Sequence, residues 1–223
     1  AYCAFEMVHH HNDRKRSFLP IAAGSVVAAI AMVSAAMLQS ATAHDGFPAY
    51  ADINKATKYQ TQDTLKTTVT ADAKIPKAPD SFIKSVLVYG YGWVDTDTGK
   101  AFTTLIHPNF RDSTKNPNGW HGHPVTLVAG TAKSTFCVGY IGDAENTAEG
   151  GISIDDATRT MKTSTSLAKL NGLKTADIDT VASFIVQEDP NCPTIEKYVN
   201  GGYTMAQLGV VVHSTTPAKL VQP

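Results

Sequence analysis

The stretch FIKSVLVYGYGWVDTDTGKAFTTLIH, residues 82–107, contains a complete predicted β-hairpin. Its first part, Phe82–Val94, is rich in β-branched and aromatic residues, as strands are, and its two glycines predict a bulge or close packing. Asp95–Gly99 has the composition of a turn, and Ala101–His107 returns as a second strand. The stretch therefore predicts an antiparallel pair of strands.

The rest of the chain repeats this pattern of short apolar runs between Gly, Asn, Asp and Pro. Threonine is β-branched and polar, suits strands with a solvated face, and occupies 25 positions of residues 44–223. A helical turn is expected at 167–170, and an arm or short helix in 44–63. Further strands are predicted at 65–70, 125–128, 134–141, 152–154, 158–165, 180–187 and 207–213. The fold class is therefore all-β, an antiparallel β-sandwich or barrel of about 8–10 short strands with little helix outside the leader.

Composition excludes several function classes. The net charge is −1, from 19 basic and 20 acidic residues, and the bulk of the chain has no Lys/Arg-rich run, so we expect no nucleic-acid partner. Walker, Rossmann, kinase and nucleophile-elbow motifs do not occur, and no pair of carboxylates suggests general acid–base catalysis. The sequence therefore favours a protein without catalysis.

The N-terminal part reads as an export signal. Met7 is the expected start, a basic segment follows it, and 18–38 is an apolar run that ends near the small-residue site Ala41–Ala43. We expect cleavage after this site, which makes 1–43 the upstream residues and signal peptide and 44–223 a single β domain. The alternative is a membrane anchor formed by 18–38. Either way, the protein is expected outside the cytoplasm, secreted or at the cell surface.

Two cysteines remain beyond the predicted leader, Cys137 and Cys192. A pair of cysteines in an exported protein predicts one disulfide. The alternative is that both thiolates bind a metal ion.

The histidines are the chemical clue. His121 and His123 lie two residues apart, so an extended backbone directs both imidazoles to one face, which is a half-site for copper or zinc. His107 ends the preceding predicted strand and is expected beside them. A third ligand is expected from His107, from His44 or from a carboxylate of the 108–119 loop. The alternative is a surface pair, or a histidine hydrogen-bonded to a loop carbonyl.

His44 would be the first residue after cleavage, so its α-amine and imidazole would chelate one metal ion together. This arrangement resembles the histidine brace of lytic polysaccharide monooxygenases and of some periplasmic copper carriers. The resemblance rests on one residue and its position, and it implies copper. The alternative is that His44 merely follows the cleavage site.

One wider resemblance rests on the block Trp120–Leu127, on Cys137, on Phe184–Val186 and on Cys192 followed by proline. These segments resemble a group of small secreted proteins of ammonia-oxidising archaea. The resemblance implies export and a disulfide-linked β domain, and it implies no activity.

Three hypotheses follow. The first is an exported β protein that binds copper or zinc through His121 and His123, with His107 or His44 helping. The second is a structural or adhesive module with a cell-envelope or cell-surface partner, and the third is a copper oxidase of the histidine-brace kind. Trp93 is expected in the core and Trp120 in the wall of a site. Substrate and oligomeric state are not predicted.

Overall fold

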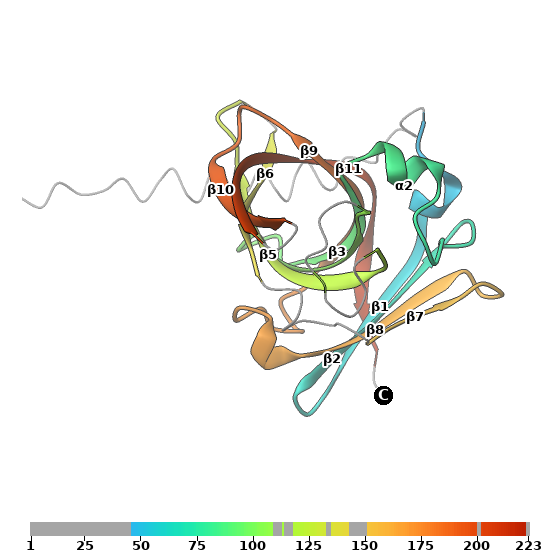
Figure 1. The fold of residues 1–223 in the computed structure, drawn as a ribbon. Coiled ribbons are helices and arrows are strands. Elements are labelled where there is room, and N and C mark those ends of the chain that lie inside the picture. The colour runs from blue at the N-terminus through green and yellow to red at the C-terminus, as the bar shows by residue number, and fades with distance from the viewer. Residues whose placement is uncertain are drawn as a thin grey trace, which may run out of the picture.

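The computed structural model describes residues 46–108, 113, 118–132, 135–142, 151–199 and 202–221. These residues form eleven strands, one short α-helix (α2, Ser81–Ser85) and two 3-10 turns (η1, Ala49–Ala51; η3, Leu167–Lys169). The expected all-β class is confirmed, and Figure 1 shows that its main body is a barrel. The strands are Ile53–Thr61 (β1), Thr64–Ala71 (β2), Val88–Val94 (β3), Lys100–Ile106 (β4), His121–Ala129 (β5), Phe136–Ile141 (β6), Ile152–Asp155 (β7), Thr160–Ser166 (β8), Thr180–Glu188 (β9), Thr194–Val199 (β10) and Gly202–Leu220 (β11).

Six strands close into an antiparallel barrel in the order β6-β5-β4-β3-β9-β11. The last seam joins β6 to β11 through two residue pairs, Cys137 with Gly209 and Phe136 with Val210. In the view of Figure 1 the barrel is seen nearly along its axis. Closure removes the sheet edges that an open antiparallel sheet would expose.

β11 continues beyond the barrel and joins a second group of strands, β1-β2-β8-β7, which we call the flanking sheet. Ala218 to Leu220 of β11 pair with Ala56 to Lys58 of β1, and this pairing is parallel. It departs from the antiparallel arrangement expected throughout. β10 pairs with the first part of β11 as an antiparallel ribbon.

The strands separate two apolar cores by the alternation of their side chains. Leu105, Val125 and Phe184 belong to the cluster inside the barrel. The opposite faces of β3 and β4 carry Trp93 and Phe102, which pack with residues of the flanking sheet in the larger core. Trp93 is thus a core residue, as expected.

The hairpin predicted within residues 82–107 is confirmed, except at the start of its first strand. β3 pairs with β4, and the Asp95 carboxylate accepts hydrogen bonds from the backbone N–H groups of Asp97 and Thr98 in the turn. The single strand predicted over 82–94 is wrong at its start, because Ser81–Ser85 is helical. Asp80 caps that helix by accepting a hydrogen bond from the backbone N–H of Ile83 at 2.9 Å.

One of the two predicted glycine positions is a close approach of strands rather than a bulge. A Cβ on Gly90 would lie 2.7 Å from the carbonyl oxygen of Thr104, so only glycine fits between β3 and β4 at this point. The register between these strands is continuous past it.

The expectation for 44–63 is correct for the short η1 turn but wrong for 53–61, which is the strand β1. The strand β1 lacks the usual alternation of apolar and polar residues because a lysine occupies one of its inward positions. The Lys58 ammonium, at an inward position, donates to the carbonyl oxygens of Thr175 at 2.6 Å and of Ile178. Burial lowers the pKa of Lys58, while Asp179 and Asp177 act in the opposite direction.

The predicted disulfide between Cys137 and Cys192 is present, with the two Cα atoms 5.4 Å apart. It joins β6 to the connection between β9 and β10. Both sulfur-bearing residues are buried. The alternative of two thiolate metal ligands is therefore wrong for this pair.

The predicted leader, 1–43, and His44 lie outside the described residues, so cleavage stays a prediction. Within the part of the chain that the structure describes, no helix combines the length and the apolar character needed to cross a membrane.

Candidate metal centre

The strand register places three histidines on one face of the barrel wall. In the pairing of β4 with β5, His121 lies opposite Leu105 and His123 lies opposite Thr103. Directly opposed residues of an antiparallel pair point to the same side. His107 follows Leu105 by two residues and so continues that face past the end of β4.

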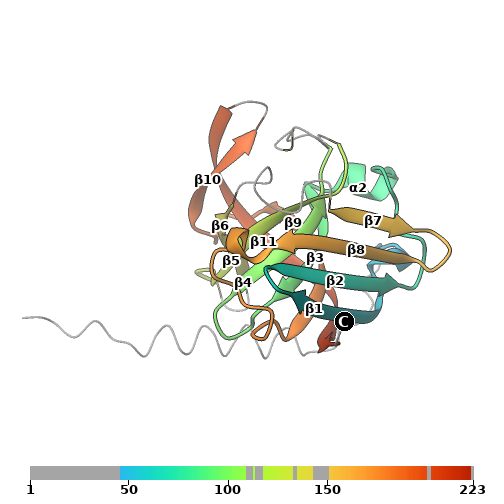
Figure 2. The ribbon, with the colours of Figure 1, turned by 90° about the horizontal axis from the view of Figure 1, so that it is seen from below.

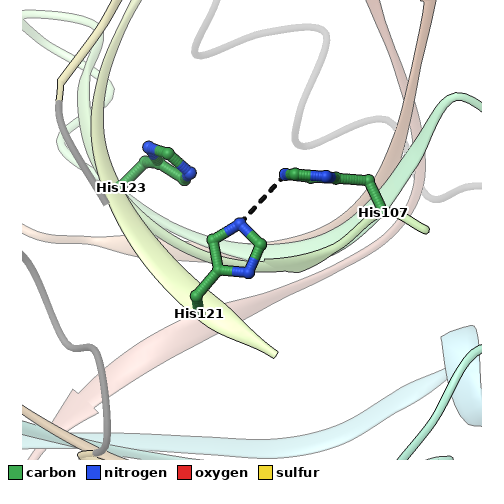
Figure 3. A group of neighbouring side chains, drawn as sticks. All are labelled: His107, His121 and His123. Carbon is green, nitrogen blue, oxygen red and sulfur yellow. Dashed lines mark hydrogen bonds between the residues drawn. The ribbon is translucent and has the colours of Figure 1, made fainter. Parts of the chain in front are cut away.

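That face is the inside of the barrel, because Leu105 belongs to the interior cluster. The exposed fractions of His107, His121 and His123 are 2%, 0% and 3%. Figure 3 shows the three imidazoles directed toward one another, two from β5 and one from the end of β4. The expected convergence of His107 on the His121–His123 pair is therefore what the structure shows.

Two backbone carbonyls fix the rings of the β5 histidines. His121 Nδ1 lies 2.9 Å from the carbonyl oxygen of Gly119, and His123 Nδ1 lies 2.6 Å from that of Gly142. A carbonyl oxygen only accepts hydrogen bonds, so both Nδ1 atoms carry a proton. In the neutral rings Nε2 then holds the lone pair, which is the state that a metal-binding imidazole needs.

The third ring meets this pair at hydrogen-bond distance. His107 Nε2 lies 2.9 Å from His121 Nε2, and ring centroids of His107 and His121 are 4.6 Å apart. When His121 is in its neutral Nδ1–H form, its Nε2 accepts and His107 Nε2 donates the shared proton. A cation at this point would take the place of that proton between the two nitrogens.

The spacing of the group is close to that of a tri-histidine site. One potential ligand atom from each ring lies within 4.8 Å of the others. A tetrahedral ion with bonds of about 2.0–2.1 Å holds its nitrogens about 3.3–3.4 Å apart. Ring movements of about 1 Å or less would bring the three nitrogens to that geometry.

The structure leaves the other predicted ligands untested. His44 lies outside the described residues. In the 108–119 loop the described positions are 108, 113, 118 and 119, and none of these is acidic. Among the described residues, the group of His, Cys, Asp and Glu that is close enough to hold an ion contains the three histidines alone.

His213 lies on a different face and takes no part in the cluster. Its Nε2 lies 2.8 Å from the carboxylate of Asp52, and its ring stacks on Phe47 with centroids 4.3 Å apart. Phe47 packs against the core shared with the flanking sheet.

Trp120 was expected in the wall of a site, and this expectation is wrong. Its indole stacks on Tyr91 at 5.8 Å between ring centroids and meets Tyr89 edge-on, in the core outside the barrel. Its Nε1 donates to the carbonyl oxygen of Pro76. The alternation of strand residues explains this, since Trp120 immediately precedes the inward His121.

Sequence reasoning missed the carbonyls of Gly119 and Gly142, because the pattern of side chains does not show where backbone acceptors lie.

Three imidazoles in an apolar interior suit copper or zinc, whereas calcium and magnesium require oxygen ligands.

Comparisons of the chain with protein-family models, with curated proteins and with solved structures gave no match.

Proposed function

We propose that this is an exported protein that binds one copper or zinc ion inside its barrel, through Nε2 of His107, His121 and His123. The observation that carries the proposal is the mutual approach of three buried imidazoles, two of which are held at Nδ1 by backbone carbonyls. Hydrogen bonds of this kind orient metal-ligating histidines and set their tautomer.

Burial supports binding over an incidental cluster. The three imidazoles are at most 3% exposed, so they do not form the surface pair that was the alternative. An ion bound between them would replace the hydrogen bond that joins His107 to His121 and would stabilise the folded state by its own binding free energy.

Export belongs to the same proposal. It is supported by the apolar run at 18–38, by the small-residue site Ala41–Ala43 and by the disulfide. Kinship with small secreted proteins of ammonia-oxidising archaea would fit export. Mass spectrometry of the exported protein should give an N-terminus at His44, and an intact 18–38 in the membrane fraction would replace cleavage by anchoring.

The test is the metal content of the purified protein after exposure to copper or zinc, measured by elemental analysis. The informative variant is His121→Asn with His123→Asn. The asparagine amide keeps a donor near the position of Nδ1 for the carbonyls of Gly119 and Gly142, but it removes the Nε2 ligand. We expect the variant to stay folded and to lose metal uptake.

His213→Gln is the matched control, because it removes a buried imidazole outside the cluster and keeps a donor toward Asp52. We expect it to bind one ion per chain, as the parent does. If the folded parent protein takes up neither metal, the structural or adhesive module becomes the better hypothesis.

A further inference from the structure

One face of the flanking sheet packs in the core next to the barrel, and the opposite face contributes nothing to that core. Along β2 and β8 every second residue is buried, for example Leu65, Val69 and Met161, and the residues between them point away from the barrel. Figure 2 looks onto this sheet, with β7, β8, β2 and β1 side by side in front of the barrel. We call the side chains that point away from the barrel the outer face.

The outer face has an unusual composition. The outward positions of β1, β2, β8 and β7 carry no aliphatic side chain, and hydroxyl groups and lysines fill almost all of them. The side chains of the outer face are Lys55, Thr57, Tyr59, Thr61, Thr64, Lys66, Thr68, Thr70, Ser153, Asp155, Thr160, Lys162, Ser164 and Ser166, with Lys219 of β11 beside Thr57.

The register arranges these groups in rows across the strands, and each of three successive rows contains lysine beside hydroxyls. Rows lie about 7 Å apart along the strands, and strands about 4.8 Å apart. The rows run Lys55–Thr70–Thr160–Asp155, then Lys219–Thr57–Thr68–Lys162–Ser153, then Tyr59–Lys66–Ser164.

The charge of this face differs from that of the whole chain, which is −1. Four lysines stand against one carboxylate, that of Asp155. This carboxylate already accepts hydrogen bonds from the backbone N–H groups of Ala157 and Thr158. The outer face is therefore a local positive surface on a nearly neutral protein, and it attracts anions.

We propose that the outer face binds an acidic polysaccharide that carries carboxylates. Lysine ammonium groups pair with carboxylates, and threonine and serine hydroxyls exchange hydrogen bonds with sugar hydroxyls. Tyr59, with the Lys66 ammonium 5.7 Å from its ring centroid, offers an aromatic platform beside a cation. A flat row of such groups suits an extended polymer.

Two other polyanions fit less well. A lipid bilayer requires apolar side chains that enter it, and the outward positions of the four strands have none. Single-stranded nucleic acid is bound by several stacking aromatic residues, whereas this face has Tyr59 alone. The proposal does not depend on the metal site.

The experiment measures binding of the purified protein to polygalacturonate by calorimetry, with its fully methyl-esterified form as the neutral polymer of the same backbone. We expect binding to the acid form, weakened by salt, and little to the ester. Replacing Lys55, Lys66 and Lys162 together by Gln should weaken binding about tenfold, since three exposed ion pairs at about 0.5 kcal/mol each would be lost.

The control replaces Lys74, Lys84 and Lys174 by Gln, which changes the net charge equally at exposed positions outside the rows. We expect this control to bind as the parent does, with both variants melting like the parent. Equal loss in both variants, equal binding of the ester, or tighter binding of duplex DNA or of anionic phospholipid vesicles would each overturn the proposal.

Discussion

Replacing Gly142 by alanine should weaken metal binding without touching a ligand. A Cβ at this position would lie 2.3 Å from Cγ and 3.0 Å from Cδ of Pro124. The proline ring is rigid, so the end of β6 and Pro124 must move apart by about 1 Å to reach ordinary contact. The carbonyl of Gly142 moves with that displacement.

The size of the effect follows from the hydrogen bond that the carbonyl receives. His123 Nδ1 donates to it at 2.6 Å, and a shift of about 1 Å takes this contact beyond hydrogen-bond range. Loss of such a partner of a ligating histidine lowers metal affinity by roughly 10–100-fold. Competition with a chromophoric chelator measures the affinity of the parent and of the variant under the same conditions.

Gly92→Ala is the control. Its added Cβ would lie next to a barrel-interior side chain, but at an ordinary contact distance, since its nearest neighbour would be Phe184 Cε1 at 3.4 Å. We expect the control to bind metal as the parent does. If the folded Gly142→Ala protein binds as tightly as the control, the carbonyl does not position His123 and the reasoning fails.

Three further predictions concern stability. Replacing Cys137 and Cys192 together by Ser should lower the free energy of unfolding in urea by about 4 kcal/mol, since the bridge closes a loop with a sequence separation of 55. Lys58→Met should cost about 3 kcal/mol in the same assay, because buried carbonyls lose their donor. Burial raises the pKa of Tyr89 and of Tyr91 above 10.0, so the folded state holds these protons more tightly. The contribution of these two tyrosines to the free energy of unfolding is therefore fully present below pH 10.0. The free energy of unfolding should fall as the pH rises above this value, which denaturant titrations at increasing pH would show.

The sequence predicted the centre of the fold because its signals there are local. A turn sequence between two apolar runs specifies the hairpin of β3 and β4, and the period of two along a strand places His121 and His123 on one face. His107 followed from the same logic, since it ends the strand that pairs with theirs.

What the sequence did not predict depends on contacts between distant segments. Closure between β6 and β11, which decides for a barrel over a sandwich, is set by pairing across most of the domain. The strand β1 was missed because Lys58 stands at an inward position, where its ammonium finds three carbonyls that no local pattern shows. The full length of β11 and its parallel pairing with β1 have the same origin.

Part of the candidate metal centre could likewise be predicted from the sequence, and part of it could not. Its three imidazoles were predictable from strand register, whereas the carbonyls of Gly119 and Gly142 and the burial of the site inside the barrel were not. The alternation of side chains along a strand also explains the position of Trp120. Because Trp120 is next to the inward His121, its side chain points out of the barrel and into the core shared with the flanking sheet.

The most direct test of the account is anomalous diffraction from crystals of the protein loaded with copper or zinc, recorded at the absorption edge of the metal. We expect one strong peak inside the barrel, about 2.0–2.2 Å from Nε2 of His107, His121 and His123. A loaded crystal whose anomalous peaks all lie elsewhere, with His107 and His121 still hydrogen-bonded to each other, would contradict it.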